Sequence, residues 1–397
     1  MPRRVVQAAF CALLIALSAP PAAQAITAAT LKQKLVDQSQ RLGTTSGAYV
    51  RDLDTGRLLY ARKADTPRAP ASNEKLLTTA TALMQMGPAA QFRTVLKATA
   101  RPVDGVIKGD VVLIGSGDPY LTAGQLRLIA NRLVALGVTE ITGKVLGDGT
   151  YLDRLRGSYD SGYAYDSDIG GSLGGLVADE GRGANPALYA ATRLRDALLA
   201  ADIVVRKGAH SGILGSRGVE LANVASVPLS TTILRINVPS DNFAAELLLK
   251  DIGAGFGSSG STAAGATVVQ DTLEGIGVKA VVHDGSGLSR ADQVSPHQLV
   301  SLLAAMNDDP DAGLAFRSSL PVAGRTGTLA KRMRGTKAQG RCFAKTGTLD
   351  GVSALTGYCA AANADTIAFS FIENNMDANR AKDVEDHMVP QIARFTG

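Results

Sequence analysis

Apolar residues recur at helical spacing just behind a short, proline-bounded stretch near the start of the chain. After Pro67 and Pro70, the apolar positions lie three and four residues apart, at Leu76, Leu77, Ala80, Leu83 and Met84. This spacing predicts an amphipathic helix with one face in a core, and Gly87 followed by Pro88 predicts its end. The first turn is left to meet solvent, with Ser72 at or near the N-cap.

Two segments of the chain share one pattern, in which longer helices accompany antiparallel strands. The strands predicted there are 48–53, 57–61, 231–238, 280–283, 341–347, 352–360 and 366–372, and the other helices are 27–43, one beginning after Asn242, 263–276, 296–306 and 378–394. The last three strands and the early hairpin would form a five-stranded antiparallel sheet covered by helices. The predicted fold class is therefore α+β.

Between residues 92 and 229 the pattern changes to short strands and glycine turns. Strands are predicted at 94–98, 109–114, 140–146 and 203–206, helices at 124–137 and 186–201, and an irregular, glycine-rich stretch at 147–183. Because the first pattern resumes afterwards, we expect 92–229 to be a smaller domain inserted into a larger one made of 26–91 and 230–397.

The first 25 residues have the three parts of a secretory signal peptide. Arg3 and Arg4 precede an apolar run over residues 5–19, and Ala23 and Ala25 supply the small residues of a cleavage site. An uncleaved N-terminal anchor is the alternative. No other stretch is long and apolar enough to cross a membrane, so we expect an exported protein that acts in the periplasm or cell wall.

Composition and charge exclude several classes. The apolar fraction of 45% and the charged fraction of 19% are those of a globular protein. A net charge of +5 with no dense run of Lys or Arg argues against nucleic-acid binding. The four histidines have no metal-site spacing, so neither a metal nor another cofactor is predicted; they are His210, His283, His297 and His387.

Two cysteines remain once Cys11 leaves with the signal. Cys342 and Cys359 flank the predicted hairpin, and a symmetric hairpin would bring them opposite each other. In an oxidising compartment they could form a disulfide; two buried thiols are the alternative. Neither has a neighbouring histidine that would make it a nucleophile.

Ser72 and Lys75 are three residues apart and share one face of the predicted helix. A serine hydroxyl needs a base to become a nucleophile, and a lysine of lowered pKa can be that base. The partial positive charge of a helix N-terminus disfavours the ammonium form. The pair alone is equally explained by an ordinary N-cap and a solvated lysine.

Two more short motifs follow along the chain, Ser240-Asp241-Asn242 and Lys345-Thr346-Gly347-Thr348. Each alone could be a helix cap or a strand end. Together and in this order, the three motifs resemble those of the penicillin-recognising serine enzymes. With residues 115–119 and 284–290, they resemble the class C low-molecular-mass penicillin-binding proteins, the D-alanyl-D-alanine carboxypeptidase/endopeptidase family, over residues 45–375.

The resemblance implies a β-lactamase/DD-peptidase-like fold and an acyl-enzyme mechanism on peptidoglycan stem peptides that end in D-Ala-D-Ala. Ser72 would attack the carbonyl of the penultimate D-alanine, Lys75 would take its proton, and Ser240 would relay a proton to the leaving D-alanine. β-Lactams would acylate Ser72 as covalent inhibitors.

The resemblance also implies a substrate-binding set: Asn242, Lys345, Thr346, Gly347 and Thr348. Asn242 would hydrogen-bond the substrate peptide, Lys345 would add positive charge, and the two threonines would hold the terminal carboxylate. Gly347 would allow a substrate strand to approach the sheet edge. The backbone N–H groups of Ser72 and Thr348 would form the oxyanion hole.

The separation between Ser72 and Ser240 is shorter than this family usually has, which implies that a second, nested domain is missing. A serine β-lactamase of the same fold and a non-catalytic cell-wall-binding protein remain the alternatives. Residues 325–328 nearly repeat the last motif but precede no apolar strand, so we assign them to a connecting loop.

Three other patterns fit known motifs poorly. Residues 170–174 match a nucleophile elbow but lack the flanking strand and helix, and residues 255–260 match a dinucleotide loop but follow a helix. His283 and Asp284 adjoin a glycine turn, which favours a strand end over part of a catalytic triad.

Overall fold

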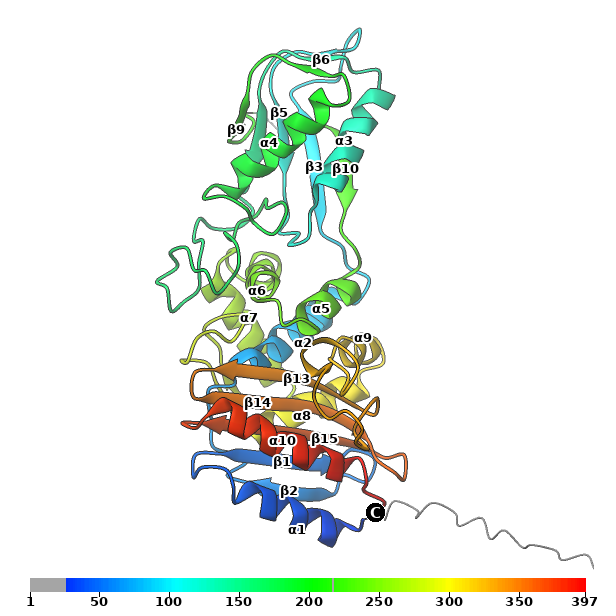
Figure 1. Cartoon of the computed structure of the whole chain (residues 1–397). Helices are drawn as coiled ribbons and strands as arrows, with labels where there is room; N and C mark the ends of the chain where they lie inside the picture. Colours follow the sequence, from blue (N-terminus) through cyan, green and yellow to red (C-terminus); the bar gives the residue numbers. More distant parts are fainter. Residues whose placement is uncertain (1–25, 216–217) are drawn as a thin grey trace, which may run out of the picture.

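The computed structural model describes residues 26–215 and 218–397. The molecule is elongated, with a larger sheet at one end and a smaller sheet at the other (Figure 1). The predicted signal peptide lies outside the described residues. Within them, no helix is both long enough and apolar enough to span a membrane.

Five antiparallel strands form the larger sheet, in the spatial order β13–β14–β15–β1–β2. Their bounds are Cys342–Leu349 for β13, Val352–Ala360 for β14, Thr366–Asn374 for β15, Gly47–Asp52 for β1 and Leu58–Arg62 for β2. The early hairpin joins the sheet through β1, where Ala48 lies opposite Phe371 of β15. The predicted five-stranded sheet and the α+β class are confirmed.

Helices cover both faces of this sheet. Helices α1 (Ala28–Ser39) and α10 (Ala378–Ile392) pack together on one face (Figure 1). Helices on the other side are α2 (Glu74–Met86), α5 (Leu229–Asn237), α6 (Asn242–Phe256), α7 (Thr262–Gly275), α8 (Pro296–Asp308) and α9 (Gly313–Ser318). Along β14, Ala354 and Tyr358 join the core with these helices, whereas Leu355 and Cys359 join the core with α1 and α10. That alternation is the two-residue period of a strand buried on both faces.

The smaller sheet has the order β10–β3–β5–β7–β9. Its strands are β3 (Arg93–Ala98), β5 (Val111–Ile114), β7 (Val145–Asp148), β9 (Ala209–Ser211) and β10 (Val219–Ala225); beside them lie β4 (Val106–Ile107), β6 (Glu140–Ile141), β8 (Val204–Val205), α3 (Ala123–Ala135) and α4 (Pro186–Leu199). These elements have a hydrophobic core of their own. They support our proposal that 92–229 is an inserted domain, with 26–91 and 230–397 forming the larger one.

Three local predictions are wrong. The segment 231–238 is not a strand but helix α5, in which Leu229, Ile233 and Ile236 are buried at three- and four-residue spacing; a short apolar run does not distinguish the two. The strand expected at 140–146 is split into β6 and β7. The chain bends at residues 142 and 143, and a Cβ at Gly143 would lie 2.3 Å from a backbone atom of Gly109. The sequence of residues 253–262 predicts a glycine-serine loop, but the loop begins later because α6 continues to Phe256.

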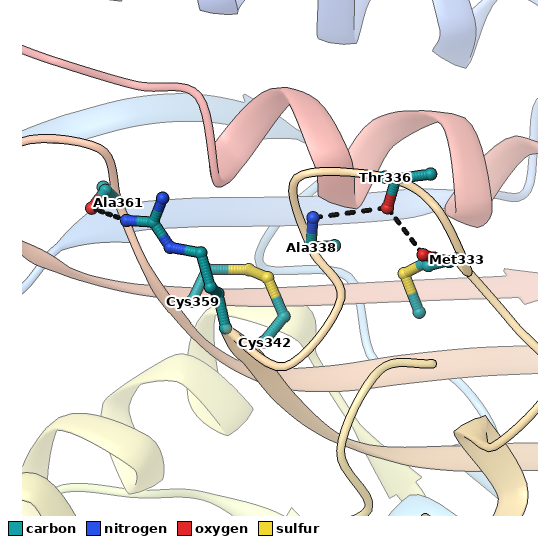
Figure 2. The surroundings of a disulfide bond; sticks show 7 residues. Met333, Thr336, Ala338, Cys342, Cys359 and Ala361 are labelled. Carbon is teal, nitrogen blue, oxygen red and sulfur yellow. Dashed lines mark hydrogen bonds between the residues drawn. A yellow bond between two sulfur atoms is a disulfide. The ribbon is translucent and has the colours of Figure 1, made fainter. Parts of the chain in front are cut away.

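Cys342 and Cys359 lie directly opposite each other on β13 and β14 and form a disulfide (Figure 2). Their Cα atoms are 4.1 Å apart, and both residues are buried. Of the two alternatives, the disulfide is therefore the one the structure contains.

We expect the double variant Cys342→Ala/Cys359→Ala to lose up to about 3 kcal/mol of unfolding free energy, because the bridge closes a loop of 17 residues in the unfolded chain. Urea unfolding of the oxidised protein and the variant measures the difference. Adding reductant should lower the midpoint of the wild type and leave the variant unchanged. Equal midpoints for the oxidised wild type and the variant would show that the bridge contributes nothing.

Candidate active site

Ser72 lies in a short 3₁₀ turn, η1 (Ala71–Asn73), immediately before α2. Ser72 lies near the N-cap, as predicted: the next residue, Asn73, holds the cap position of α2, and no side chain makes a capping hydrogen bond there. Ala71 has φ +47°, an unfavourable backbone conformation for alanine. The turn therefore presents Ser72, which is half-buried, in a backbone geometry that its surroundings must hold in place.

Two glycines allow neighbouring segments to touch this turn. A Cβ at Gly347, on edge strand β13, would lie 2.6 Å from the Pro70 carbonyl oxygen. A Cβ at Gly287 would lie 1.9 Å from the Ala71 carbonyl oxygen. The close approach that requires Gly347 is thus an approach of the Ser72 turn itself, which differs from the reason given by the sequence analysis.

Lys75 is fully buried in the first turn of α2, and its Nζ donates to three oxygens. They are Ser72 Oγ at 3.1 Å, Asn242 Oδ1 at 2.6 Å and the Ser286 carbonyl at 2.6 Å. Burial lowers the pKa of Lys75 to about 8, although nearby carboxyl groups oppose the shift. At pH 7 roughly a tenth of the protein then carries Lys75 as a free amine next to the serine hydroxyl.

Ser240 and Lys345 meet on the other side of the site. Ser240 follows α5 in a turn with φ +69°, and Asp241 caps α6 by accepting from the N–H of Ala244 at 3.0 Å. Lys345 Nζ donates to Ser240 Oγ at 2.8 Å and to the Thr346 carbonyl at 2.9 Å. Lys345 is fully buried, and its pKa is well below the ordinary value because of that burial and, secondarily, the charge of Lys75.

Asn242 opens α6 and uses both ends of its amide. Its Oδ1 accepts from Lys75 as above, and its Nδ2 donates to the Asp168 carbonyl at 2.8 Å. An amide nitrogen has two N–H groups, so one of them remains for a substrate. Asp168 belongs to the irregular stretch after β7, which contains no helix or strand as far as Asn185.

Thr328 is the residue at this site that the sequence analysis missed. Its Oγ1 lies 2.7 Å from Thr346 Oγ1, and its N–H donates to the Val238 carbonyl at 3.2 Å. Residues 325–328 do form a connecting loop, as predicted, with a 3₁₀ turn η2 (Gly327–Leu329). Their likeness to the Lys345 motif was the signal, and it was set aside because no strand follows.

The structure brings the three predicted motifs together at one place. Hydrogen bonds join Ser72 to Lys75, Lys75 to Asn242, and Lys345 to Ser240. Gly347 lies against the Ser72 turn, and Thr346 and Thr348 flank it on β13. Among the described residues, no group of three or more His, Cys, Asp or Glu side chains is arranged to hold a metal ion.

The competing motifs lie in other settings. Residues 170–174 have neither a strand before them nor a helix after them, and Gly255 belongs to the last turn of α6. The His283 ring packs against Tyr159, with centroids 4.7 Å apart. None of these segments has the context that its motif requires.

Comparison with known proteins gives consistent matches. Residues 27–181 and 178–395 match the model of the D-Ala-D-Ala carboxypeptidase 3 (S13) family. A D-alanyl-D-alanine carboxypeptidase of Actinomadura sp. (strain R39) is 31% identical over 89% of this chain and 82% of its own. Penicillin binding protein 4 of Haemophilus influenzae has the same fold, with a TM-score of 0.76 at 21% identity over 89% of this chain and 97% of that one. A predatory peptidoglycan endopeptidase of Bdellovibrio bacteriovorus also superimposes, with a TM-score of 0.57 at 17% identity over 86% and 90%.

Proposed function

Because the chain belongs to the D-Ala-D-Ala carboxypeptidase (S13) family, we propose that Ser72 is the nucleophile with which this serine-type carboxypeptidase cleaves D-Ala-D-Ala termini. The family and activity predicted from the three motifs are confirmed by the family match. The observation that carries the proposal for Ser72 is the buried Lys75 amine, 3.1 Å from its hydroxyl. A lysine of lowered pKa within hydrogen-bond reach is the base that such a hydroxyl needs.

In the proposed acylation step, Ser72 Oγ attacks the carbonyl carbon of the penultimate D-alanine and passes its proton to Lys75 Nζ. The C–N bond of the tetrahedral intermediate then breaks. The proton that Lys75 accepted then passes through the Ser240 hydroxyl, which Lys345 holds, to the departing D-alanine nitrogen. Water attacks the resulting ester, which releases the shortened peptide acid and restores the Ser72 hydroxyl.

The backbone N–H groups of Ser72 and Thr348 are proposed to stabilise the oxyanion. Support comes from the contact between β13 and η1, where a Cβ on Gly347 would lie 3.1 Å from the Ser72 nitrogen. Two donors fixed by a buried turn and an edge strand need no reorganisation during the reaction. The same edge would align the substrate as an added strand.

We propose that hydroxyl groups from two segments bind the substrate's terminal carboxylate. Thr346 and Thr348 come from β13, and Thr328 joins them from the loop that the sequence analysis had set aside. Lys345 is proposed to add positive charge in its ammonium form, which burial disfavours; its Nζ donates to Ser240 and to the Thr346 carbonyl. Asn242 is proposed to contact the peptide with its remaining N–H and to hold Lys75 with its oxygen.

Thr328→Val is expected to raise KM for a D-Ala-D-Ala peptide about tenfold and to leave kcat within about twofold, because one hydrogen bond to a charged carboxylate is lost. Steady-state kinetics of D-alanine release measure both. Thr326→Val, in the same loop, is the matched control. A peptide with a C-terminal amide should lose the distinction between Thr328→Val and wild type; an equal KM defect on both peptides would contradict a role in carboxylate binding.

Peptidoglycan stem peptides are the proposed substrates and β-lactams the proposed covalent inhibitors. The Haemophilus influenzae relative has also been solved in complex with a β-lactam, and the Bdellovibrio relative is a peptidoglycan endopeptidase. The signal-peptide pattern and the disulfide support a location outside the cytoplasm, in the periplasm or cell wall. Release of D-alanine compared with cleavage of cross-linked peptide dimers measures how carboxypeptidase and endopeptidase activities divide.

A fluorescent penicillin separates the proposed function from its alternatives. A lasting covalent adduct that is lost in Ser72→Ala supports the peptidase. Rapid turnover of the drug would indicate a serine β-lactamase, and a folded protein that forms no adduct would indicate a non-catalytic wall-binding protein.

A further inference from the structure

Four carboxyl groups with no exposed surface form a cluster, three of whose members face Lys75, and the acylation step proposed above uses none of them. They are Glu74, Glu246, Asp284 and Asp292. Glu246 and Asp284 belong to one hydrogen-bonded unit with the turn 284–289, which also contacts Lys75. Glu74 has no hydrogen-bond partner for either carboxyl oxygen.

The turn 284–289 is held by hydrogen bonds to Asp284 and Glu246. Asp284 Oδ1 accepts from the N–H groups of Ser286 and Gly287 at 3.1 and 2.6 Å, and its Oδ2 accepts from Ser289 at 2.7 Å. Glu246 Oε1 accepts from the N–H groups of Gly285 and Ser286 at 3.1 and 2.9 Å. Ser286 therefore links the two side chains through its backbone: its N–H donates to Glu246, and its carbonyl, in the next peptide unit, accepts from Lys75.

Helix α6 reaches Lys75 in two ways. Asn242, at its first turn, accepts directly from Nζ. Glu246 lies four residues later, on the same face of the helix. It accepts from the Ser286 N–H, and the carbonyl of that same residue accepts from Lys75. One rigid helix thus sets both the position of the Lys75 amine and one of the charges that it experiences.

The buried acids cannot all be ionised. Burial and neighbouring acids raise the pKa values of Glu74 and Asp292 well above the ordinary range, which favours their neutral forms. Burial and Asp284 raise the pKa of Glu246 to about 8, close to that of Lys75. Glu246 is therefore the acid whose charge changes in the range where Lys75 itself titrates.

Other charges also face this pair. Lys75 experiences Asp284, Glu246, Asp241 and Glu74, which favour its ammonium form, and Lys345, which opposes it. Glu246 is faced by Asp284, Glu74 and Lys75, by Lys250 of its own helix, and by Tyr163. Asp284 also holds this turn, through the N–H groups of Ser286 and Gly287, whereas Glu246 links the Ser286 N–H to helix α6.

We propose that Glu246 is a positioning residue for acylation, a proposal that rests on the function assigned above to Ser72 and Lys75. Glu246 holds the backbone of Ser286 against Lys75, and its charge governs the release of the Lys75 proton. An ionised Glu246 retains the proton on Lys75. A neutral Glu246 leaves Lys75 free to accept the proton of Ser72.

Glu246→Gln tests the charge without removing the brace. Glutamine keeps an oxygen acceptor but cannot ionise, so Lys75 loses a negative neighbour as pH rises. The rate constant for acylation by a fluorescent penicillin is measured from about pH 6 to about pH 10. The acid limb of the Glu246→Gln profile should lie roughly one pH unit below that of the wild type. The plateau should stay within about threefold of wild type.

Two further variants separate charge from structure. Glu246→Ala removes the acceptor of the buried Gly285 N–H and one of the two acceptors of the Ser286 N–H, and it should lower the plateau at least about tenfold. Glu373→Gln changes another fully buried glutamate, on β15, and should leave limb and plateau unchanged. A Glu246→Gln limb that coincides with wild type, or a plateau as low as that of Glu246→Ala without a shifted limb, would overturn the proposal.

The wild-type profile supplies a measurement that depends on no variant. Two coupled groups titrate together over a wider range than a single ionisation. We expect a broadened acid limb, and a limb that fits one ionisation would contradict the coupling. The two proposals fail in different ways. Absence of a penicillin adduct that depends on Ser72 would contradict the function proposed for Ser72. A Ser72-dependent adduct together with an unshifted Glu246→Gln limb would contradict the role of Glu246 alone.

Discussion

Ser72→Ala is expected to lower kcat for D-alanine release about 10⁴-fold or more, because loss of the nucleophile removes the covalent route altogether. The residual rate would come from the oxyanion hole and from substrate binding. Substrate affinity should persist, since the alanine removes one oxygen from a half-buried position and leaves β13 in place. Release of D-alanine from a stem-peptide analogue, with binding measured by calorimetry, checks both expectations.

Ser230→Ala, on α5, is the control for loss of a serine hydroxyl from the same domain and should retain wild-type kinetics. A Ser72→Ala protein that is folded and keeps more than about a hundredth of the wild-type kcat would mean that another group attacks the peptide.

Lys75→Met is expected to lower kcat/KM by about 10² to 10⁴, the range that a general base contributes. Methionine suits the fully buried position, so the loss should reflect the missing amine rather than an unpaired charge. In the wild type the free amine increases as pH rises through about 8, so kcat/KM should rise over that interval. The variant should lack this limb.

Lys250→Met provides the matched control. Lys250 is likewise buried, and its Nζ donates to Asp153 at 2.6 Å, away from Ser72. At the pH optimum it should keep kcat/KM within about tenfold of wild type. A Lys75→Met profile that still rises through pH 8 would assign that limb to another group, with Lys345 as the first candidate.

The larger sheet could be predicted from the sequence because its pairings are mostly local. The strands on either side of Asp350 and Gly351 are joined by a tight turn, and their symmetric pairing also put Cys342 opposite Cys359. Helix α5 was misread because its apolar run is short and its period is decided by tertiary packing. The order of the smaller sheet depends on contacts between distant segments, which no local pattern specifies.

The site residues that belong to short sequence motifs were predicted, and the site residues outside such motifs were missed. Ser72, Ser240 and Lys345 each belong to such a motif, although the sequence could not say that their hydrogen bonds converge. Thr328 lay in a repeat without a strand, and its role depends on a contact with Thr346. Glu246 looks like an ordinary helix residue in the sequence; only burial beside the Ser286 peptide reveals its position.

Mass spectrometry of the protein acylated by penicillin tests the central claim most directly. Tryptic peptide 69–75 contains Ser72 as its only serine, and peptide 236–250 contains Ser240 as its only serine. We predict that peptide 69–75 gains the mass of one intact penicillin molecule and that the gain disappears in Ser72→Ala. An adduct on peptide 236–250 or on any other peptide, or no adduct on natively folded protein, would contradict the assignment of Ser72 as the nucleophile.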